Sequence, residues 1–435
     1  MGGITLPSFL ANVSLKRFQS ESFIILDIGT FNVKALYIEE KSGRGEIVAH
    51  AFTQHVSSDI NADGSFNVSG IMNTCRQALD KLRKASAQKR IFPKKVLLNI
   101  GGGFVFGKTL NQTYIRERPQ EEIDERELGN IIQKVQQRSY EQIRKYFQKE
   151  TARSELEVHI ISADVQEVKI DGYQVVSPMG FKGKEIGVSL FNSYIPKLYL
   201  TIFQGIITDL RLELLSIVSG PYSVFRLLSN RNVSLTDLIL VDIGGSITEI
   251  AITRKGKLED VKSVPLGGSS FTKSISDTLK VGFWEAENIK RRFARGLVSG
   301  QVAKKLEAII AKDVELFIRG LEVVLSEFSQ LSLLPSRIYV YGGGSEIPSI
   351  GKFLRKTEWR DTLSFFANPT IEKLSPSAIV GVGKESETRS FLQPTGLEHA
   401  FWTVPFAIAD TFLQKDVSGN EMNKALKRSL RLIQE

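Results

Sequence analysis

The chain contains very little cysteine and histidine. Cys75 is the only cysteine among 435 residues, which excludes an internal disulfide framework and suits a reducing compartment. The four histidines, His50, His55, His159 and His399, form no metal-ligand pattern, so we expect no structural zinc. With 42% hydrophobic residues, a chain of this length can bury more than one core and should divide into two or more domains.

Long apolar runs and a basic-then-apolar signal peptide are also lacking. No stretch approaches the roughly 20 apolar residues of a transmembrane helix, so we expect a soluble or peripherally attached protein. The formal net charge of +9 would permit nucleic acid or an anionic membrane as a partner. The basic residues are spread out without aromatic interleaving or a recognisable nucleic-acid module, so we expect no nucleic-acid partner.

The sequence does contain one motif twice. Residues 23–30 and 238–246 each run from an apolar strand into an aspartate, then glycine and a hydroxyl side chain. A carboxylate at the end of a buried strand, beside unobstructed backbone N–H groups, suits a metal-bound phosphate chain. We therefore predict Asp27 and Asp242 as ligands of Mg²⁺, which keeps part of its hydration shell. Either turn alone is a common hairpin, but the pair predicts two similar halves closing on one nucleotide.

Two further glycine clusters follow strands. Residues 337–341 lead into Gly342, Gly343 and Gly344, and Pro348 then opens a helix. Three consecutive glycines remove the side chains between backbone and ligand, so adenine and ribose can lie against the main chain. The cluster at residues 101–103 lacks an acidic residue and a hydroxyl, and we interpret it as a structural turn.

In order and spacing, these motifs resemble the actin-like ATPase superfamily, over residues from about 23 to about 383. The resemblance implies an α/β class: a duplicated, ribonuclease H-like fold with two halves around a nucleotide cleft. It places a first phosphate loop at residues 27–34, a second at 242–248 and an adenosine motif at 341–345. ATP and Mg²⁺ are the implied cofactors.

The segment from residue 95 to about 193 separates this chain from most of the superfamily. We expect a long polar helix over about 120–151 with a break, and strands near 156–163, 166–170, 173–176 and 185–192. Asp171-Gly172 predicts a hairpin between two of them. This α+β insert resembles the small subdomain of FtsA, the bacterial cell-division actin homologue, and of its relative PilM from the type IV pilus machinery. A turn at 177–180 keeps the family's Pro and Gly but has Ser177 for Asn.

The resemblance also implies the site. The matching positions, expected to bind the nucleotide, are Asp27, Gly29, Thr30, Lys34, Asp242, Gly244, Gly245, Ser246, Thr248, Gly267, Gly268, Glu287, Lys290, Gly342, Gly343 and Gly344. Lys34 would neutralise phosphate charge, although by itself it is typical of a strand-edge surface residue. Glu287 and Lys290, one helical turn apart, either face the ribose or form an ordinary surface pair.

The second phosphate loop departs from the family pattern. Ser246 and Ile247 stand where a glycine and a threonine are usual, and Glu249 replaces an aspartate. A side chain at Ser246 narrows the space for the γ-phosphate, and Ile247 removes a hydroxyl donor. Actins orient the attacking water with a polar side chain between a strand and a helix, and the nearest candidate here is Ser216, a poor base. We expect at most a slow ATPase.

The expected organisation has six parts. They are an N-terminal extension (1–20), a first actin-like subdomain (21–94 and 195–230), the inserted subdomain (95–194), a second actin-like subdomain (231–272 and 330–400), a helical subdomain over the nucleotide (273–329) and a tail with an amphipathic helix (401–435). In the first part of the fold, we expect a helix over residues 68–87 with Ser69 as its cap.

The tail carries an amphipathic pattern. Over residues 422–433 one helical stripe is apolar, and Lys424, Lys427, Arg428 and Arg431 occupy the rest. This is typical of an interfacial membrane helix, with which FtsA also ends, but a helix packed on the body would show the same pattern. Residues 6–18 are a second, weaker candidate.

The resemblance to FtsA implies a cytoplasmic, ATP-binding cell-division protein that is peripheral on the inner face of the membrane. It implies self-association into filaments and tethering of the tubulin-like division protein FtsZ to the membrane through the C-terminal helix. The alternative is a PilM-like pilus-assembly adaptor that binds a membrane-protein peptide. A sugar-kinase-like phosphotransferase would need an aspartate base facing a substrate cleft, and no aspartate is convincingly placed for that role.

Overall fold

The computed structural model describes residues 22–41, 44–56, 65–151, 157–230, 237–329, 332–356, 358–382 and 395–414. Within them, no helix is long and apolar enough to cross a membrane. The expected membrane helix at 422–433 and the candidate at 6–18 lie outside the described residues.

A five-stranded sheet forms the first half, in the order β3-β2-β1-β4-β9. Its strands are β1 (Ser22–Ile28), β2 (Asn32–Lys41), β3 (Arg44–Gln54), β4 (Lys95–Ile100) and β9 (Glu213–Val218). Side chains of β1 alternate between two cores, as the period of a strand requires. Ile24 and Leu26 pack with α1 (Val68–Ala85) and α3 (Lys197–Asp209), while Phe23 and Ile25 pack with α4 (Gly220–Asn230) and α10 (Thr403–Gln414).

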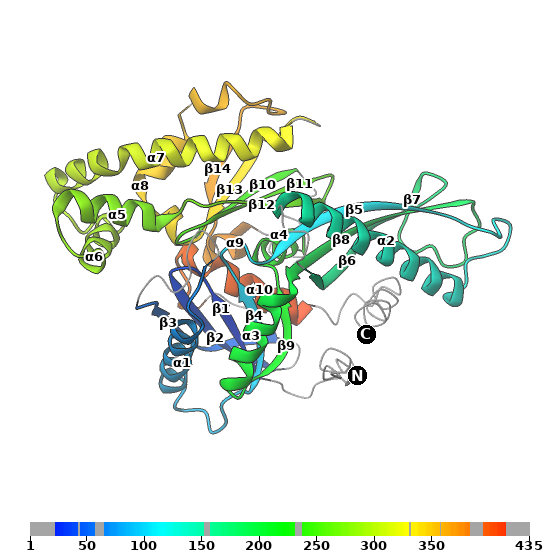
Figure 1. Ribbon diagram of the computed structural model, residues 1–435, viewed down its shortest axis with the longest axis horizontal. Coiled ribbons are helices and arrows are strands. Elements are labelled where there is room, and N and C mark those ends of the chain that lie inside the picture. Colours follow the sequence, from blue (N-terminus) through cyan, green and yellow to red (C-terminus); the bar gives the residue numbers. More distant parts are fainter. Residues whose placement is uncertain are drawn as a thin grey trace.

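A nine-stranded sheet runs through the second half and the insert. Its order is β14-β13-β10-β11-β12-β5-β8-β6-β7. The strands of the second half are β10 (Leu238–Ile243), β11 (Thr248–Arg254), β12 (Lys257–Val264), β13 (Arg337–Tyr341) and β14 (Thr370–Lys373). Those of the insert are β5 (Phe106–Ile115), β6 (Val158–Ile170), β7 (Tyr173–Val175) and β8 (Glu185–Pro196), covered by α2 (Glu125–Thr151). Figure 1 shows the insert projecting sideways from the two halves.

The duplication predicted from the two aspartate turns is visible in the strand pairing. β1 is antiparallel to β2 and parallel to β4, and β10 is likewise antiparallel to β11 and parallel to β13. Asp27 therefore lies beside Asn99 of β4, and Asp242 beside Tyr341 of β13. Both aspartates stand at the carboxyl ends of parallel strands, where ligands of α/β sheets bind.

Helices cover the second half. α5 (Gly268–Leu279), α6 (Phe283–Ala294) and α7 (Gly300–Ser329) form a core with β10, β11 and β13, and α8 (Pro348–Leu354) joins it. Three short 3-10 turns, Gly343–Glu346, Glu358–Arg360 and Ala400–Trp402, and helix α9 (Pro376–Val382) complete the described elements.

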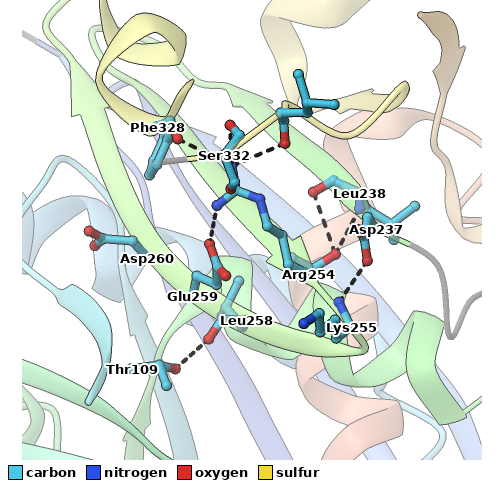
Figure 2. A network of polar contacts seen from close by, with 12 residues as sticks. Thr109, Asp237, Leu238, Arg254, Lys255, Leu258, Glu259, Asp260, Phe328 and Ser332 are labelled. Atoms are coloured by element: carbon cyan, nitrogen blue, oxygen red, sulfur yellow. Dashed lines mark hydrogen bonds and ion pairs between the residues drawn. The ribbon is translucent and has the colours of Figure 1, made fainter. Parts of the chain in front are cut away.

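A polar network ties the hairpin of β11 and β12 to the end of α7 (Figure 2). Arg254 contacts Glu259 and donates to the carbonyls of Phe328 (3.2 Å) and Ser332 (3.4 Å). The hydroxyl of Thr109 donates to the carbonyl of Leu258, which belongs to the same hairpin. Since Thr109 belongs to β5, the insert is fastened to the second half by side chains as well as by the sheet.

Several expected boundaries were wrong. Asn67, not Ser69, caps α1, because its side chain accepts from the N–H of Gly70 (3.2 Å). Helix α2 begins at Glu125 and has no break, and one strand, β6, replaces the two expected over 156–170. β4 pairs with β1 in the first sheet, although we expected it to open the insert. The expected hairpin at Asp171-Gly172 is confirmed, with positive φ at both residues.

Candidate functional site

A cleft of about 440 Å³ lies between the two halves, within the size range of small-molecule sites. It is lined by loops at the carboxyl ends of β1, β4, β10 and β13 and by α5 and α6. Most of the predicted site residues line it: Asp27, Gly29, Thr30, Lys34, Asp242, Gly244, Gly245, Gly268, Glu287, Lys290, Gly342, Gly343 and Gly344.

Asp27 is buried at the floor of the cleft, 3% exposed. Its Oδ1 accepts from Asn99 Nδ2 (2.8 Å), and its Oδ2 is paired with Lys34 Nζ (2.6 Å). Lys34 also donates to the carbonyl of Phe401 (3.0 Å). Lys34 therefore points into the cleft and is not a strand-edge surface residue.

Asp242 and Glu249 form a second acidic pair, on neighbouring strands in direct register. Burial raises the pKa of Asp242 to about 6, with the charge of Asp27 adding to the rise and Lys34 opposing it. Burial also raises the pKa of Glu249 to about 8, with further contributions from Asp242 and Asp27. At this end of the cleft, the described residues therefore place three carboxyl groups, those of Asp27, Asp242 and Glu249, against one ammonium group, that of Lys34.

The two phosphate-loop candidates touch each other. Thr30 Oγ1 accepts from the backbone N–H of Ser246 (2.8 Å), which joins the first loop to the second. A Cβ on Gly245 would lie 2.5 Å from Cβ of Phe31, so only glycine permits this approach. Phe31 then reaches α6, with its ring centroid 5.6 Å from that of Trp284.

The third glycine cluster lies against the carboxylate of Asp242. Gly342 has φ +83°, and a Cβ there would lie 2.2 Å from Asp242 Oδ1. The N–H of Gly342 donates to the carbonyl of Ala400 (3.2 Å), and Glu346 Oε1 accepts from the N–H of Ala400 (3.0 Å). The 3-10 turn at Ala400–Trp402 is therefore held against the glycines, and Phe401 lines the cleft.

Glu287 and Lys290 are buried, 5% and 8% exposed, so they are not a surface pair. Lys290 Nζ lies 2.7 Å from Glu287 Oε2 and donates to the carbonyl of Gly268 and to Thr272 Oγ1, both at 2.7 Å. Arg291 contacts the other oxygen of Glu287 (2.9 Å). Burial lowers the pKa of Lys290, and the charge of Glu287 opposes this effect.

Four predicted residues do not line the cleft. Ser246 contributes its backbone to the loop contact, Thr248 donates to the carbonyl of Leu266 (2.8 Å), and Gly267 packs beneath Gly245. Ser216 lies on β9 and donates to the carbonyl of Ile217 (3.1 Å). The structure therefore gives no support to Ser216 as the residue that orients water.

Some cleft residues were not predicted. Gly101 and Gly102, interpreted as a purely structural turn, do line the cleft, as do Asn99, Glu249 and Phe401. The strand that runs into residues 101–103 was a usable signal, because it repeats the pattern of the other glycine clusters with an amide in place of the carboxylate. Glu249 was noted only as a departure from the family pattern.

The acidic groups fit Mg²⁺. Among the residues that the structure describes, the buried Oδ2 of Asp27 has no partner besides Lys34, and burial disfavours the charged form of Asp242. A divalent cation would favour both carboxylates. Within the described ranges, no group of three or more His, Cys, Asp and Glu is arranged to hold a metal ion. The protein would therefore supply two carboxylates, and phosphate and water would complete the shell, as is usual for Mg²⁺.

Comparison with known proteins agrees with this architecture. The family model of the cell division protein FtsA matches residues 239–385. FtsA of Bacillus subtilis is 22% identical over 357 residues, covering 76% of this chain and 75% of the relative. FtsA of Neisseria meningitidis is 24% identical over 411 residues, covering 88% and 91%. A solved PilM-PilN type IV pilus biogenesis complex superposes with a TM-score of 0.59 at 15% identity, covering 91% of this chain and 98% of the other.

The duplicated halves and the cleft between them define an actin-like fold, and the predicted fold class is confirmed. Within that fold, residues 239–385 match the FtsA family model and the chain is similar to FtsA cell division proteins over most of its length, in agreement with the resemblance that its motifs indicated.

Proposed function

We propose that this protein binds ATP with Mg²⁺ in the cleft and acts in cell division as an FtsA-like, self-associating protein. The observation that carries the nucleotide site is the meeting of the two aspartate turns. They come from opposite halves, share the contact between Thr30 and Ser246, and leave Asp27 and Asp242 facing one space with Lys34.

Each part of a nucleotide has complementary groups in this cleft. The phosphates would meet Lys34 and the backbone of the two loops. Asp27 and Asp242 would hold the metal ion, which supplies charge neutralisation for the phosphates. Gly342 to Gly344 leave the main chain open to a flat base, and the buried Glu287 and Lys290 would face the ribose.

The substitution Asp242→Ala tests the site. We expect it to abolish Mg²⁺-dependent ATP binding, measured by calorimetry, because it removes one of the two carboxylates that would hold the ion. The fold should survive, because burial disfavours the charged form of the Asp242 carboxylate that is removed. Glu372→Ala, on the exposed face of β14, is the matched control. Unchanged ATP affinity in Asp242→Ala would contradict the assignment.

For the partners, the proposal rests on the relation to FtsA. The chain would sit on the inner face of the cell membrane through residues 422–433 and hold FtsZ there. Co-sedimentation with anionic liposomes, with and without the residues after Val417, tests this attachment. Binding should be lost with the tail and should weaken with salt.

A PilM-like adaptor is the second candidate, favoured by the superposition on the PilM-PilN complex. Such a protein would bind a peptide of a membrane protein and need no lipid contact of its own. Tight binding of such a peptide, with no binding to liposomes by the unmodified chain, would favour this candidate over the first.

A further inference from the structure

One edge of the first half combines exposed cations with an exposed apolar side chain. The loop from Ser86 to Lys94 joins α1 to β4, and Ile91 within it is 76% exposed. Lys84, Arg90 and Lys94 are exposed near Ile91 in the sequence. Arg211 follows the end of α3 and lies near Lys94, because the N–H of Glu213 donates to the carbonyl of Lys94 (2.8 Å). We call these five residues, Lys84, Arg90, Ile91, Lys94 and Arg211, the basic edge.

The loop holds Ile91 outward through fixed contacts on either side of it. Tyr37 donates its hydroxyl to the carbonyl of Ile91 (3.3 Å), and the ring of Phe92 packs against Tyr37. Pro93 is buried. Because its neighbours are anchored, Ile91 is presented to solvent by a defined backbone, and it differs from other exposed apolar side chains in the exposed cations that surround it, a combination that suits an anionic membrane surface.

The cations of the basic edge are available to a partner. The side chains of Lys84, Arg90, Lys94 and Arg211 form no ion pair with any residue that the structure describes. Lys89, in the same loop, is by contrast paired with Glu39 (2.5 Å). The exposed acids Asp209 and Glu213 flank Arg211, and the exposed Asp80 on α1 is paired with Arg83, so the excess of positive charge lies on the loop with Arg90 and Lys94 and on Lys84.

The first and last described residues of the chain lie near this edge. Ser22 begins β1, and β1 pairs in parallel with β4, so Ser22 lies close to Lys94 and Lys95. Helix α10 ends at Gln414, and Phe412 packs on Phe23 with ring centroids 4.9 Å apart. The end of α10, after which the amphipathic pattern follows in the sequence, therefore lies at the same end of the first sheet as Lys94. Figure 1 shows α1 and α3 at the opposite end of the molecule from α7.

We propose that the basic edge is a second membrane contact, in which Ile91 enters the headgroup region of an anionic bilayer and the four cations face its phosphates. This inference rests on the peripheral attachment proposed above and deepens it, because a tail anchored beside the edge would bring the edge to the same surface. The first sheet would then stand with the amino ends of β1, β4 and β9 toward the membrane, and the insert and α7 would remain clear of it.

Vesicle binding of the full chain tests the contact. We would compare phosphatidylcholine vesicles with and without phosphatidylserine. Each cation near an anionic surface contributes roughly fivefold to partitioning, so Arg90→Glu with Lys94→Glu should weaken binding by at least roughly 25-fold and flatten its salt dependence. Ile91→Asp should weaken it roughly tenfold. Matched controls on α7, Lys304→Glu with Lys305→Glu and Leu316→Asp, should change little, because both sites are exposed and distant.

A fluorescent label gives a direct second readout. Cys75 is buried and its pKa is raised to about 12, so Ile91→Cys introduces the reactive thiol. An environment-sensitive dye at residue 91 should shift to the blue on vesicle binding, and the same dye at Leu316→Cys should not.

The outcomes separate this contact from the proposed function. If removal of the residues after Val417 abolishes binding while the edge variants bind normally and the dye at residue 91 does not shift, the tail is the membrane anchor and the edge contact is refuted. Absence of vesicle binding by the unmodified chain overturns both. Retained ATP binding in each variant would show that a lost contact is not a lost fold.

Discussion

The pKa of Glu249 gives the sharpest test of the electrostatics in the cleft. Glu249 lies opposite Asp242 on β11, and burial with two neighbouring carboxylates raises its pKa to about 8 from an ordinary value of 4.5. Between these two values the folded protein binds this proton more tightly than the unfolded chain. The contribution of Glu249 to the free energy of unfolding is therefore fully present below about pH 4.5 and is lost as the pH rises through about 8.

The size of the effect follows from the same values. The difference between a pKa of about 8 and 4.5, at about 1.36 kcal/mol per pH unit, gives an upper limit of about 5 kcal/mol. Water in the cleft screens the charge, so we expect about 2 kcal/mol. Glu249→Gln removes the titration but keeps the shape of the protonated side chain. The variant should match the unmodified protein near pH 5 and be about 2 kcal/mol more stable at pH 9.

Urea denaturation of the metal-free and nucleotide-free protein measures this difference across the pH range. The burial of Asp242 also lowers stability as the pH rises, but its window ends near pH 6, so it does not mimic the expected divergence. Glu372→Gln, on the exposed face of β14, is the control. If the stabilities of Glu249→Gln and the unmodified protein run parallel from pH 5 to pH 9, the raised pKa is refuted.

Three further changes test other parts of the cleft. Lys290→Met should destabilise the protein by about 3 kcal/mol in denaturation, because it leaves the buried Glu287 with Arg291 as its remaining cationic partner among the described residues and with the hydroxyl of Thr272. Ser246→Gly with Ile247→Thr should raise a slow rate of ATP hydrolysis, because it widens the space for the γ-phosphate and restores a hydroxyl donor. An unmodified protein that already turns over about ten times per second would contradict the expectation that Ser246 and Ile247 slow hydrolysis. Phe31→Ala removes a ring that bridges the halves, so a fluorescent ATP analogue should dissociate faster.

The sequence predicted the parts of this fold that depend on local pattern. An apolar strand ending in Asp27 or Asp242 and a glycine specifies its own burial and its own turn, and both strands form as expected. The hairpin at Asp171-Gly172 is likewise a local preference for positive φ. Boundaries were less predictable. β6 continues where a break was expected, because pairing with β8 overrides the local signal.

The contacts between distant segments were beyond prediction from single motifs. Lys34 could be assigned to the cleft only by its offset from Asp27, but the carbonyl that it meets belongs to Phe401, 367 residues later. That carbonyl lies in a short turn between a helix of the second half and α10, which packs in the core of the first half. We had assigned residues 401–414 to a tail, because their apolar composition does not reveal which sheet they cover.

This long-range contact also relates the site to the proposed membrane attachment. Lys34 is shared between Asp27 and the carbonyl of Phe401, immediately before α10, and α10 leads directly into the tail. A phosphate chain would compete with the carbonyl of Phe401 for the ammonium group of Lys34, since anionic oxygens attract an ammonium group more strongly than a carbonyl does. A metal ion held by Asp27 would weaken the other contact of Lys34 in the same way. Lys34 therefore joins the first aspartate to the segment that leads into α10, so a nucleotide that drew Lys34 away from Phe401 would release one of the contacts of that segment.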